Sequence, residues 1–133
     1  MIKIAIAATL IASSLAGCAV APTADQQARQ VALNNAAPTC INKDDCSAKW
    51  DAAQLWVVHH AAYKIQTASN VLIETFNPGD GDTGLAASVT KEPTGAGKYK
   101  LLISLWCGNM FGCDSDPYSS ALDFDKVVAA AAP

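Results

Sequence analysis

Cysteine is the residue type in this chain whose number and spacing most clearly indicate chemistry. A thiolate can bind a metal, pair in a disulfide or carry a covalent group. Four of the five cysteines form two pairs of identical spacing, Cys40 with Cys46 and Cys107 with Cys113. Cysteines of structural zinc sites usually stand about two to four residues apart, so this wider spacing argues against zinc. We therefore expect no metal.

The fifth cysteine, Cys18, ends a stretch with the features of a secretory leader. Lys3 gives a positively charged start, residues 4–15 form a short apolar run, and small residues precede the cysteine. The ending Leu15-Ala16-Gly17-Cys18 resembles the lipobox of bacterial lipoproteins. That resemblance implies cleavage before Cys18, and hence a signal peptide over residues 1–17 with lipid attachment at Cys18.

The membrane interaction that this leader predicts is an anchor rather than a span. The apolar run is shorter than the roughly 20 residues that a helix needs to cross a bilayer. Ala19, not aspartate, follows the cysteine. By resemblance to the sorting pattern of enteric bacteria, this favours the periplasmic face of the outer membrane. We expect an exported, lipid-anchored protein of the bacterial cell envelope.

Export places the remaining cysteines in an oxidising compartment, where an even number of them in a small chain predicts disulfides. Four cysteines allow three connectivities, and the sequence alone does not choose among them. We favour the local pairs, Cys40–Cys46 and Cys107–Cys113. Each would close a short loop and add about 2–3 kcal/mol of stability on the chain-entropy model.

The second of these pairs would constrain a loop that carries Asn109, Met110 and Phe111. Met and Phe on a closed loop are candidate contact residues, because preorganisation lowers the ordering cost of binding. The alternative is that Phe111 folds back and caps the core beneath it. We favour this second arrangement for Phe111 and keep the loop as the candidate contact site.

Sequence signatures of catalysis are missing from the chain. It contains no G-x-S-x-G elbow, H-E-x-x-H pair, Walker loop or dinucleotide fingerprint. His59 and His60 are adjacent, so on a helix they point about 100° apart and cannot form a helical metal pair. We expect them to interact with the last carbonyls of a helix. No cofactor is expected, and the sequence favours a non-catalytic protein over an enzyme.

The charge of the mature chain restricts its partners. Removal of the leader leaves eight bases against twelve acids, a net charge of about −4, with no basic run. Nucleic-acid binding needs clustered Lys and Arg to displace counterions, so we expect no nucleic-acid partner. The expected partners are the membrane, through the lipid on Cys18, and another protein.

Composition divides the mature chain into a flexible tether over residues 18–39 and one small domain over residues 40–133. The tether is rich in Ala, Gln, Asn and Pro, with few large aliphatic residues. Its Ala, Gln and Arg residues would also permit a short helix from about residue 25 to 34.

Two helices are predicted in the domain. The first runs over residues 42–61, with Asn42 as its N-cap and with Trp50 and Trp56 on its apolar face as core residues. The second begins at Asp116-Pro117, an N-cap followed by a proline at the first helical position. Its predicted inward stripe contains Ala121, Phe124 and Val128.

Strands are predicted between these helices. Residues 63–76 alternate as one long strand with a bulge, which we prefer, or as two strands around a tight turn. Residues 77–84 form a loop by composition. Residues 85–91 and 98–106 form a hairpin, with 92–97 as its connection.

Helices that flank a run of strands predict the α+β class. We expect a three- to four-stranded antiparallel sheet, with the Trp-bearing N-terminal helix and the C-terminal helix packed on it. The preferred function is a non-catalytic, lipid-anchored envelope domain that binds another macromolecule, such as a secreted hydrolase that it inhibits. The alternatives are a small envelope hydrolase with a carboxylate-based site and a purely structural outer-membrane lipoprotein.

Overall fold

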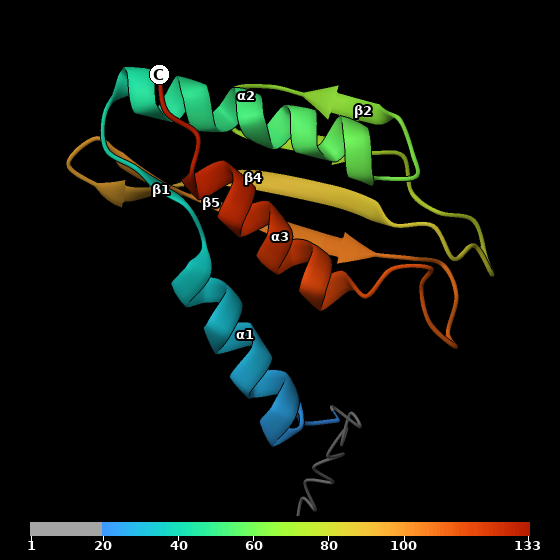
Figure 1. The fold of residues 1–133 in the computed structure, drawn as a ribbon. Helices are drawn as coiled ribbons and strands as arrows, with labels where there is room; N and C mark the ends of the chain where they lie inside the picture. Colours follow the sequence, from blue (N-terminus) through green and yellow to red (C-terminus); the bar gives the residue numbers. More distant parts are fainter. Residues whose placement is uncertain (1–19) are drawn as a thin grey trace, which may run out of the picture.

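Two helices, α2 (Lys43–His60) and α3 (Pro117–Ala129), cover one face of an antiparallel sheet in the computed structural model, which describes residues 20–133 (Figure 1). The predicted leader, residues 1–17, and the predicted attachment site Cys18 lie outside the described residues. The strands follow one another in the chain between the two helices, apart from one short strand before α2. The α+β class predicted from the sequence is confirmed.

The sheet has five strands in the order β1-β5-β4-β3-β2, and every neighbouring pair is antiparallel. The strands are β1 (Thr39–Cys40), β2 (Ile65–Ala68), β3 (Leu72–Thr75), β4 (Ala86–Gly95) and β5 (Lys98–Trp106). The sequence predicted three or four. The additional strand is β1, whose two residues pair with Lys100 and Tyr99 of β5 and are too few to show a period of two.

Residues 63–76 form two strands, so our preferred single bulged strand is wrong and the alternative of two strands around a tight turn is correct. Strands β2 and β3 pair across the turn Ser69-Asn70-Val71. The Ser69 N–H donates to the Leu72 carbonyl at 2.8 Å, and the Leu72 N–H donates to the Ser69 hydroxyl at 3.1 Å. These bonds give the turn the polar partners that a continuous strand would find in its neighbours.

The predicted hairpin of residues 85–91 and 98–106 is present and is longer than expected. Pairing continues through Glu92 and Pro93 to Gly95, which lies opposite Lys98. Gly95 at the end of β4 and the turn residues Ala96 and Gly97 have φ angles of 100°, 52° and 73°. Glycine at two of the three positions lowers the cost of this left-handed backbone.

The Trp-bearing helix α2 begins where the sequence predicted. Asn42 is its N-cap, and the Asn42 side chain accepts a hydrogen bond from the Asp45 N–H at 2.9 Å. Trp50 and Trp56 are core residues, as predicted, with 9% and 3% of their surface exposed. Their indole N–H groups donate to the Ser69 carbonyl at 3.0 Å and to the Asp123 carboxylate at 2.9 Å.

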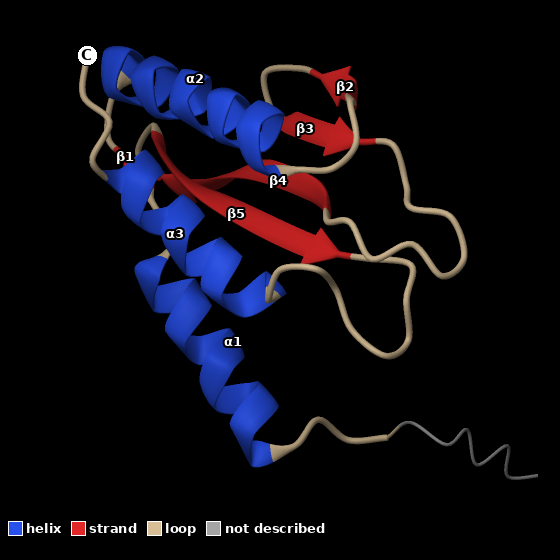
Figure 2. Ribbon diagram, turned by 45° about the vertical axis from the view of Figure 1, so that its right-hand side comes forward, coloured by secondary structure: helices blue, strands red, loops and turns tan. Residues whose placement is uncertain are grey.

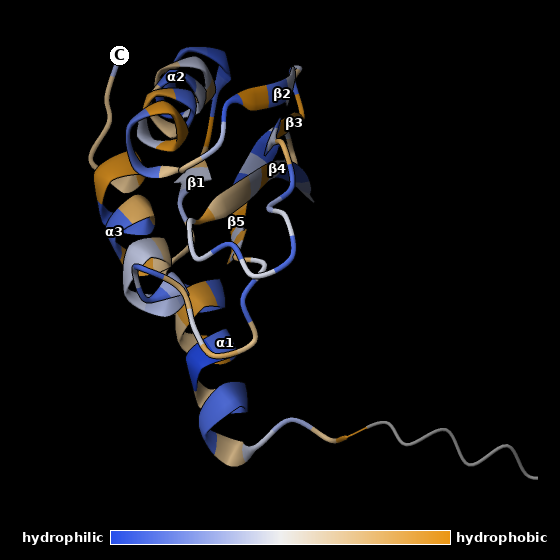
Figure 3. Ribbon diagram, turned by 90° about the vertical axis from the view of Figure 1, so that its right-hand side faces the viewer, coloured by the Kyte–Doolittle hydropathy of each residue, from blue (hydrophilic) through white to orange (hydrophobic). Residues whose placement is uncertain are grey.

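Helix α3 starts at the predicted cap, where the Asp116 side chain accepts the Ser119 N–H at 2.8 Å. Its predicted inward stripe of Ala121, Phe124 and Val128 is buried. The core lies between this stripe, the buried face of α2 and the inner face of the sheet. In Figure 3 the helices form one layer and the strands the other, with apolar segments of α3 and β5 in orange.

Helix α1 (Ala24–Ala36) lies within the segment that the sequence assigned to a flexible tether. It begins with a capping box, in which the Gln26 N–H donates to the Thr23 hydroxyl and the Thr23 N–H donates to the Gln26 side chain. One end of α1 packs against α3, although none of its residues is fully buried (Figure 2). That residues 18–39 also act as a tether stays a prediction.

None of the helices within residues 20–133 has both the length and the hydrophobicity that crossing a bilayer requires.

Candidate functional site

Both predicted local disulfides are present. Cys40 pairs with Cys46, with their Cα atoms 4.9 Å apart, and Cys107 pairs with Cys113, with their Cα atoms 5.7 Å apart. The first bond is buried in the core and joins β1 to the first turn of α2. The second is only partly buried and closes the loop that carries the predicted contact residues.

This loop is attached to the loop of residues 77–84 between β3 and β4, and both lie at the same end of the sheet (Figure 2). The Gly81 N–H donates to the Gly108 carbonyl at 3.0 Å, and the Gly108 N–H donates to the Asp82 carbonyl at 2.9 Å. The Asn109 side-chain amide donates to the Gly81 carbonyl at 3.0 Å. Together with the disulfide, these bonds restrain the loop, which has no hydrophobic core of its own.

Close backbone contact between the two loops requires a glycine at position 108. A Cβ atom placed on Gly108 would collide with the Gly79 carbonyl oxygen. The obstacle is backbone, which cannot rotate away as a flexible side chain could. Gly108 therefore allows the two loops to approach closely enough for their hydrogen bonds to form.

Met110 and Phe111 project from this restrained loop into solvent, with 89% and 93% of their surface exposed. The prediction that Phe111 folds back to cap the core is therefore wrong. The Phe111 N–H donates to the Asn109 side chain at 2.8 Å, and this local bond helps to fix the tip. Asn109 thus positions the tip, while Met110 and Phe111 form its apolar surface, the arrangement that the candidate contact site requires.

The two paired loops are acidic. Residues 77–84 and 107–116 contain no base and include Asp80, Asp82, Asp114 and Asp116. The Tyr63 hydroxyl donates to the Asp82 carboxylate at 3.1 Å. Burial raises the pKa of Tyr63, and the bond to Asp82 and the charges of Asp82 and Asp114 raise it further. The tip is therefore apolar and its surroundings are negatively charged.

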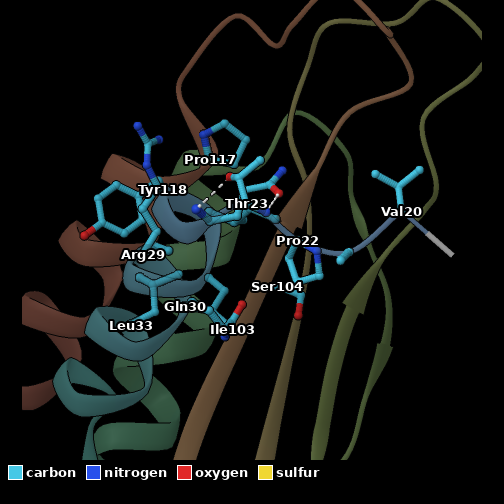
Figure 4. Close-up of a pocket in the computed structure, with 14 residues that line it drawn as sticks. Val20, Pro22, Thr23, Arg29, Gln30, Leu33, Ile103, Ser104, Pro117 and Tyr118 are labelled. Atoms are coloured by element: carbon cyan, nitrogen blue, oxygen red, sulfur yellow. Dashed lines mark hydrogen bonds between the residues drawn. The ribbon is translucent and has the colours of Figure 1, made fainter.

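A groove of about 790 Å³ lies elsewhere, between α1, the start of α3 and strand β5 (Figure 4). In Figure 4, Arg29 and Tyr118 lie beside each other at one part of the groove, while Gln30 and Leu33 of α1 lie further along it near Ile103 of β5. The Arg29 guanidinium stands 5.2 Å from the centre of the Tyr118 ring. A smaller cavity of about 130 Å³ adjoins the groove and shares four of its lining residues, Gln30, Leu33, Ile103 and Ser104.

Asp125, which was not among the candidate site residues predicted from the sequence, is one of the residues that line the small cavity. Only 3% of Asp125 is exposed. Burial raises the pKa of this carboxyl from 3.8 to about 6. A signal was present in the sequence, because Asp125 follows Ala121 by four residues and precedes Val128 by three, a spacing that places all three on one side of the helix.

Within residues 20–133, no described pocket brings several acids together and no metal site is formed. Asp125 is the one acidic residue that lines the four pockets described within residues 20–133. Over the same range, no three His, Cys, Asp or Glu side chains come together as a metal site. His60, predicted to interact with the end of its helix, lies with its Nδ1 atom 2.8 Å from the Trp56 carbonyl oxygen.

No family model matches this chain, and no curated protein or solved structure matches it either.

Proposed function

We propose that this chain is a non-catalytic, lipid-anchored domain of the bacterial cell envelope that binds another macromolecule through its disulfide-closed loop. The contact surface consists of Met110 and Phe111, positioned by Asn109. The anchor is the lipid on Cys18, and Ala19 favours the periplasmic face of the outer membrane. The lipobox-like ending of the leader supports the anchor, and the geometry of the loop supports the binding.

The observation that carries the binding proposal is the exposure of two large apolar side chains on a restrained loop. Met110 and Phe111 contribute almost nothing to the core, since 89% and 93% of their surface is exposed. The disulfide and the bonds to residues 77–84 restrict the loop before any partner arrives. Because the loop is already ordered, little conformational entropy is lost when the tip is buried against a partner.

The charge around the tip specifies the partner more closely. Four acids and no base lie in the two loops that form this end of the molecule. A complementary partner offers an apolar pocket with a basic rim, because opposite charges around an apolar contact steer association. A protruding tip also fits a concave surface better than a flat one. The narrower form of the proposal is an inhibitor that inserts this tip into the cleft of a secreted hydrolase with a basic rim.

The anchor would hold the domain close to the membrane. Residues 19–23 are the only residues between Cys18 and the first residue of α1. Five extended residues span at most about 18 Å. With α1 packed on α3, a lipid on Cys18 would therefore keep the domain within a short distance of the bilayer, where a membrane-associated or periplasmic partner would meet it.

The anchor is tested on the full chain expressed in a bacterial host. Mass spectrometry of the purified protein should show an N-terminal Cys18 that carries a diacylglyceryl group. The Cys18→Ser variant should leave the membrane fraction. An unmodified N-terminus, or an intact precursor in the cytosol, would contradict the anchor and the compartment together.

The binding surface is tested by crosslinking and pull-down from intact envelopes. We expect the wild-type chain to capture a defined protein, and the Met110→Ser/Phe111→Ser double variant to lose at least about 90% of it, since a central anchor contributes 2 kcal/mol or more. Val71→Ser is the matched control, because Val71 is also apolar and 55% exposed but lies at the β2–β3 turn. Equal capture by both variants would remove the support for the loop.

A further inference from the structure

Strand β5 has an unpaired edge along its second half. On that side its only partner strand in the described part of the chain is β1, which pairs with Tyr99 and Lys100. The last backbone bond to this side is from the Leu101 N–H to the Pro38 carbonyl, at 2.8 Å. Backbone groups alternate in direction along an antiparallel strand. The N–H and C=O groups of Ile103 and Leu105 therefore point towards the open edge.

A helix stands beside this edge but does not pair with it. Helix α1 forms the opposite wall of the groove of about 790 Å³, and the start of α3 forms its end. Helices commonly shield a strand edge, but they offer it no backbone hydrogen bonds. The groove along the edge is lined by apolar side chains from all three elements, namely Leu33, Ile103, Leu105 and Ala121.

The adjoining cavity of about 130 Å³ presents a single buried acid, Asp125. The Asp125 carboxylate forms no salt bridge among residues 20–133, although only 3% of the residue is exposed. No carboxylate oxygen in this range is fully enclosed without a hydrogen-bond partner, so the small accessible part of the Asp125 side chain faces the cavity that it lines. Its polar neighbours in the cavity wall are uncharged: Gln30, Asn34 and Ser104. A buried carboxylate without a cation is costly, and a cation that entered the cavity would offset this cost.

We propose that this groove binds an extended polypeptide segment, which adds a strand to the edge of β5 and places a lysine or arginine side chain against Asp125. The main chain of the segment pairs with the backbone groups of Ile103 and Leu105. Its apolar side chains pack against Leu33 and Ala121. The arrangement is that of β-strand addition, in which main-chain bonds give affinity and side-chain pockets give specificity.

The open edge of β5 and the Asp125 carboxylate together define this ligand. The open edge requires a chain with alternating backbone donors and acceptors, which a small amine lacks. The carboxylate requires a cationic side chain that reaches sideways from that chain into the small cavity. An extended peptide with one basic side chain meets both requirements.

The test uses the full mature chain and short Val-Thr repeat peptides, in which one lysine is moved through every position. We expect at least one peptide to bind and to slow amide hydrogen exchange at Ile103 and Leu105. Leu102 and Ser104 serve as internal controls, since their amides already point towards β4 and should change little. Binding should disappear when the amides of the best peptide are N-methylated, because its main chain then loses its donors.

The role of Asp125 is tested with the near-isosteric Asp125→Asn variant, after its amide spectrum has shown a native fold. The wild-type chain should prefer the lysine peptide over its norleucine counterpart by about tenfold, the value of one charge-assisted hydrogen bond. This preference should fall below about threefold in the variant. No protection of Ile103 and Leu105 at about 1 mM of any peptide, or an unchanged lysine preference in Asp125→Asn, would overturn the proposal.

This groove is independent of the disulfide-closed loop. The Met110→Ser/Phe111→Ser variant should bind the peptides as the wild-type chain does.

Discussion

Asp125 is buried at a cost that should be visible in the stability of the protein. Burial raises its pKa from 3.8 to about 6, so the folded state retains a proton that the unfolded chain has already released. In this pH interval the folded state binds more protons, and stability therefore falls as the pH rises. The penalty is absent below about pH 4 and complete above about pH 6.

We predict that Asp125→Asn stabilises the protein at pH 7 and has little effect at pH 4. The shift corresponds to at most about 3 kcal/mol, at 1.36 kcal/mol per pKa unit. Urea unfolding at a series of pH values measures the difference. Asp51→Asn, at an exposed position of α2, is the control and should change stability by less than about 0.5 kcal/mol. A variant less stable than the wild type at pH 7 would contradict the assignment of an unpartnered acid.

Gly108 is the residue on which the approach of the two loops depends. We predict that Gly108→Ala destabilises the protein by about 1–3 kcal/mol, because its Cβ atom would meet the Gly79 carbonyl and the loops would separate. The variant should also speed hydrogen exchange of the Gly81 amide, which is bonded to the Gly108 carbonyl.

Met110→Ala is the matched control for Gly108→Ala. Its side chain is 89% exposed on the same loop, so the free energy of unfolding should change by less than about 0.5 kcal/mol. Equal stabilities of the Gly108→Ala variant and the wild type would mean that the loops are not packed as described.

At the scale of elements, the two disulfides enclose loops of equal length but differ in their surroundings. Both join cysteines with a sequence separation of 6, so the chain-entropy contribution of each is the same, about 2 kcal/mol. Cys40 and Cys46 lie in the hydrophobic core, with 0% and 7% of their surface exposed. Removal of this pair also loses buried contacts, whereas Cys107 and Cys113 are only partly buried.

We therefore predict that Cys40→Ala/Cys46→Ala costs more stability than Cys107→Ala/Cys113→Ala. The second variant should lose about 2 kcal/mol, and the first about 1–2 kcal/mol more. Urea unfolding under non-reducing conditions compares the two. If the two variants lost equal stability, the extra contribution from core packing would be excluded.

The elements that could be predicted from the sequence are those with strong local signals. Asn42 and Asp116 mark the starts of α2 and α3 by their capping side chains, and apolar residues at helical spacing identify the buried faces. The β4–β5 hairpin could be predicted from the alternation of apolar and polar residues in its strands and from the glycines in its connection. The tight turn at Ser69 was predicted only as the alternative to one bulged strand, because both sides of it alternate in the same way. The bond from the Leu72 N–H to the Ser69 hydroxyl is visible only in the fold.

At the scale of the whole molecule, the candidate sites needed tertiary structure. The sequence placed Asn109, Met110 and Phe111 on one constrained loop, but it could not show that Phe111 points outward. The outward position of Phe111 depends on the loop of residues 77–84, which is distant in the chain and forms hydrogen bonds with Gly108 and Asn109. The groove beside β5 was not predictable either, because it combines a short β1, the position of α1 and one buried acid of α3.

Photo-crosslinking in living cells tests the proposed contact tip most directly. Benzoylphenylalanine would replace Phe111 in the otherwise unchanged full-length chain, or Val71 as the control. We predict a discrete adduct from position 111 that is absent from position 71 and is strongly reduced by Met110→Ser. No adduct at position 111 beyond that at position 71 would contradict the claim that this loop contacts a partner.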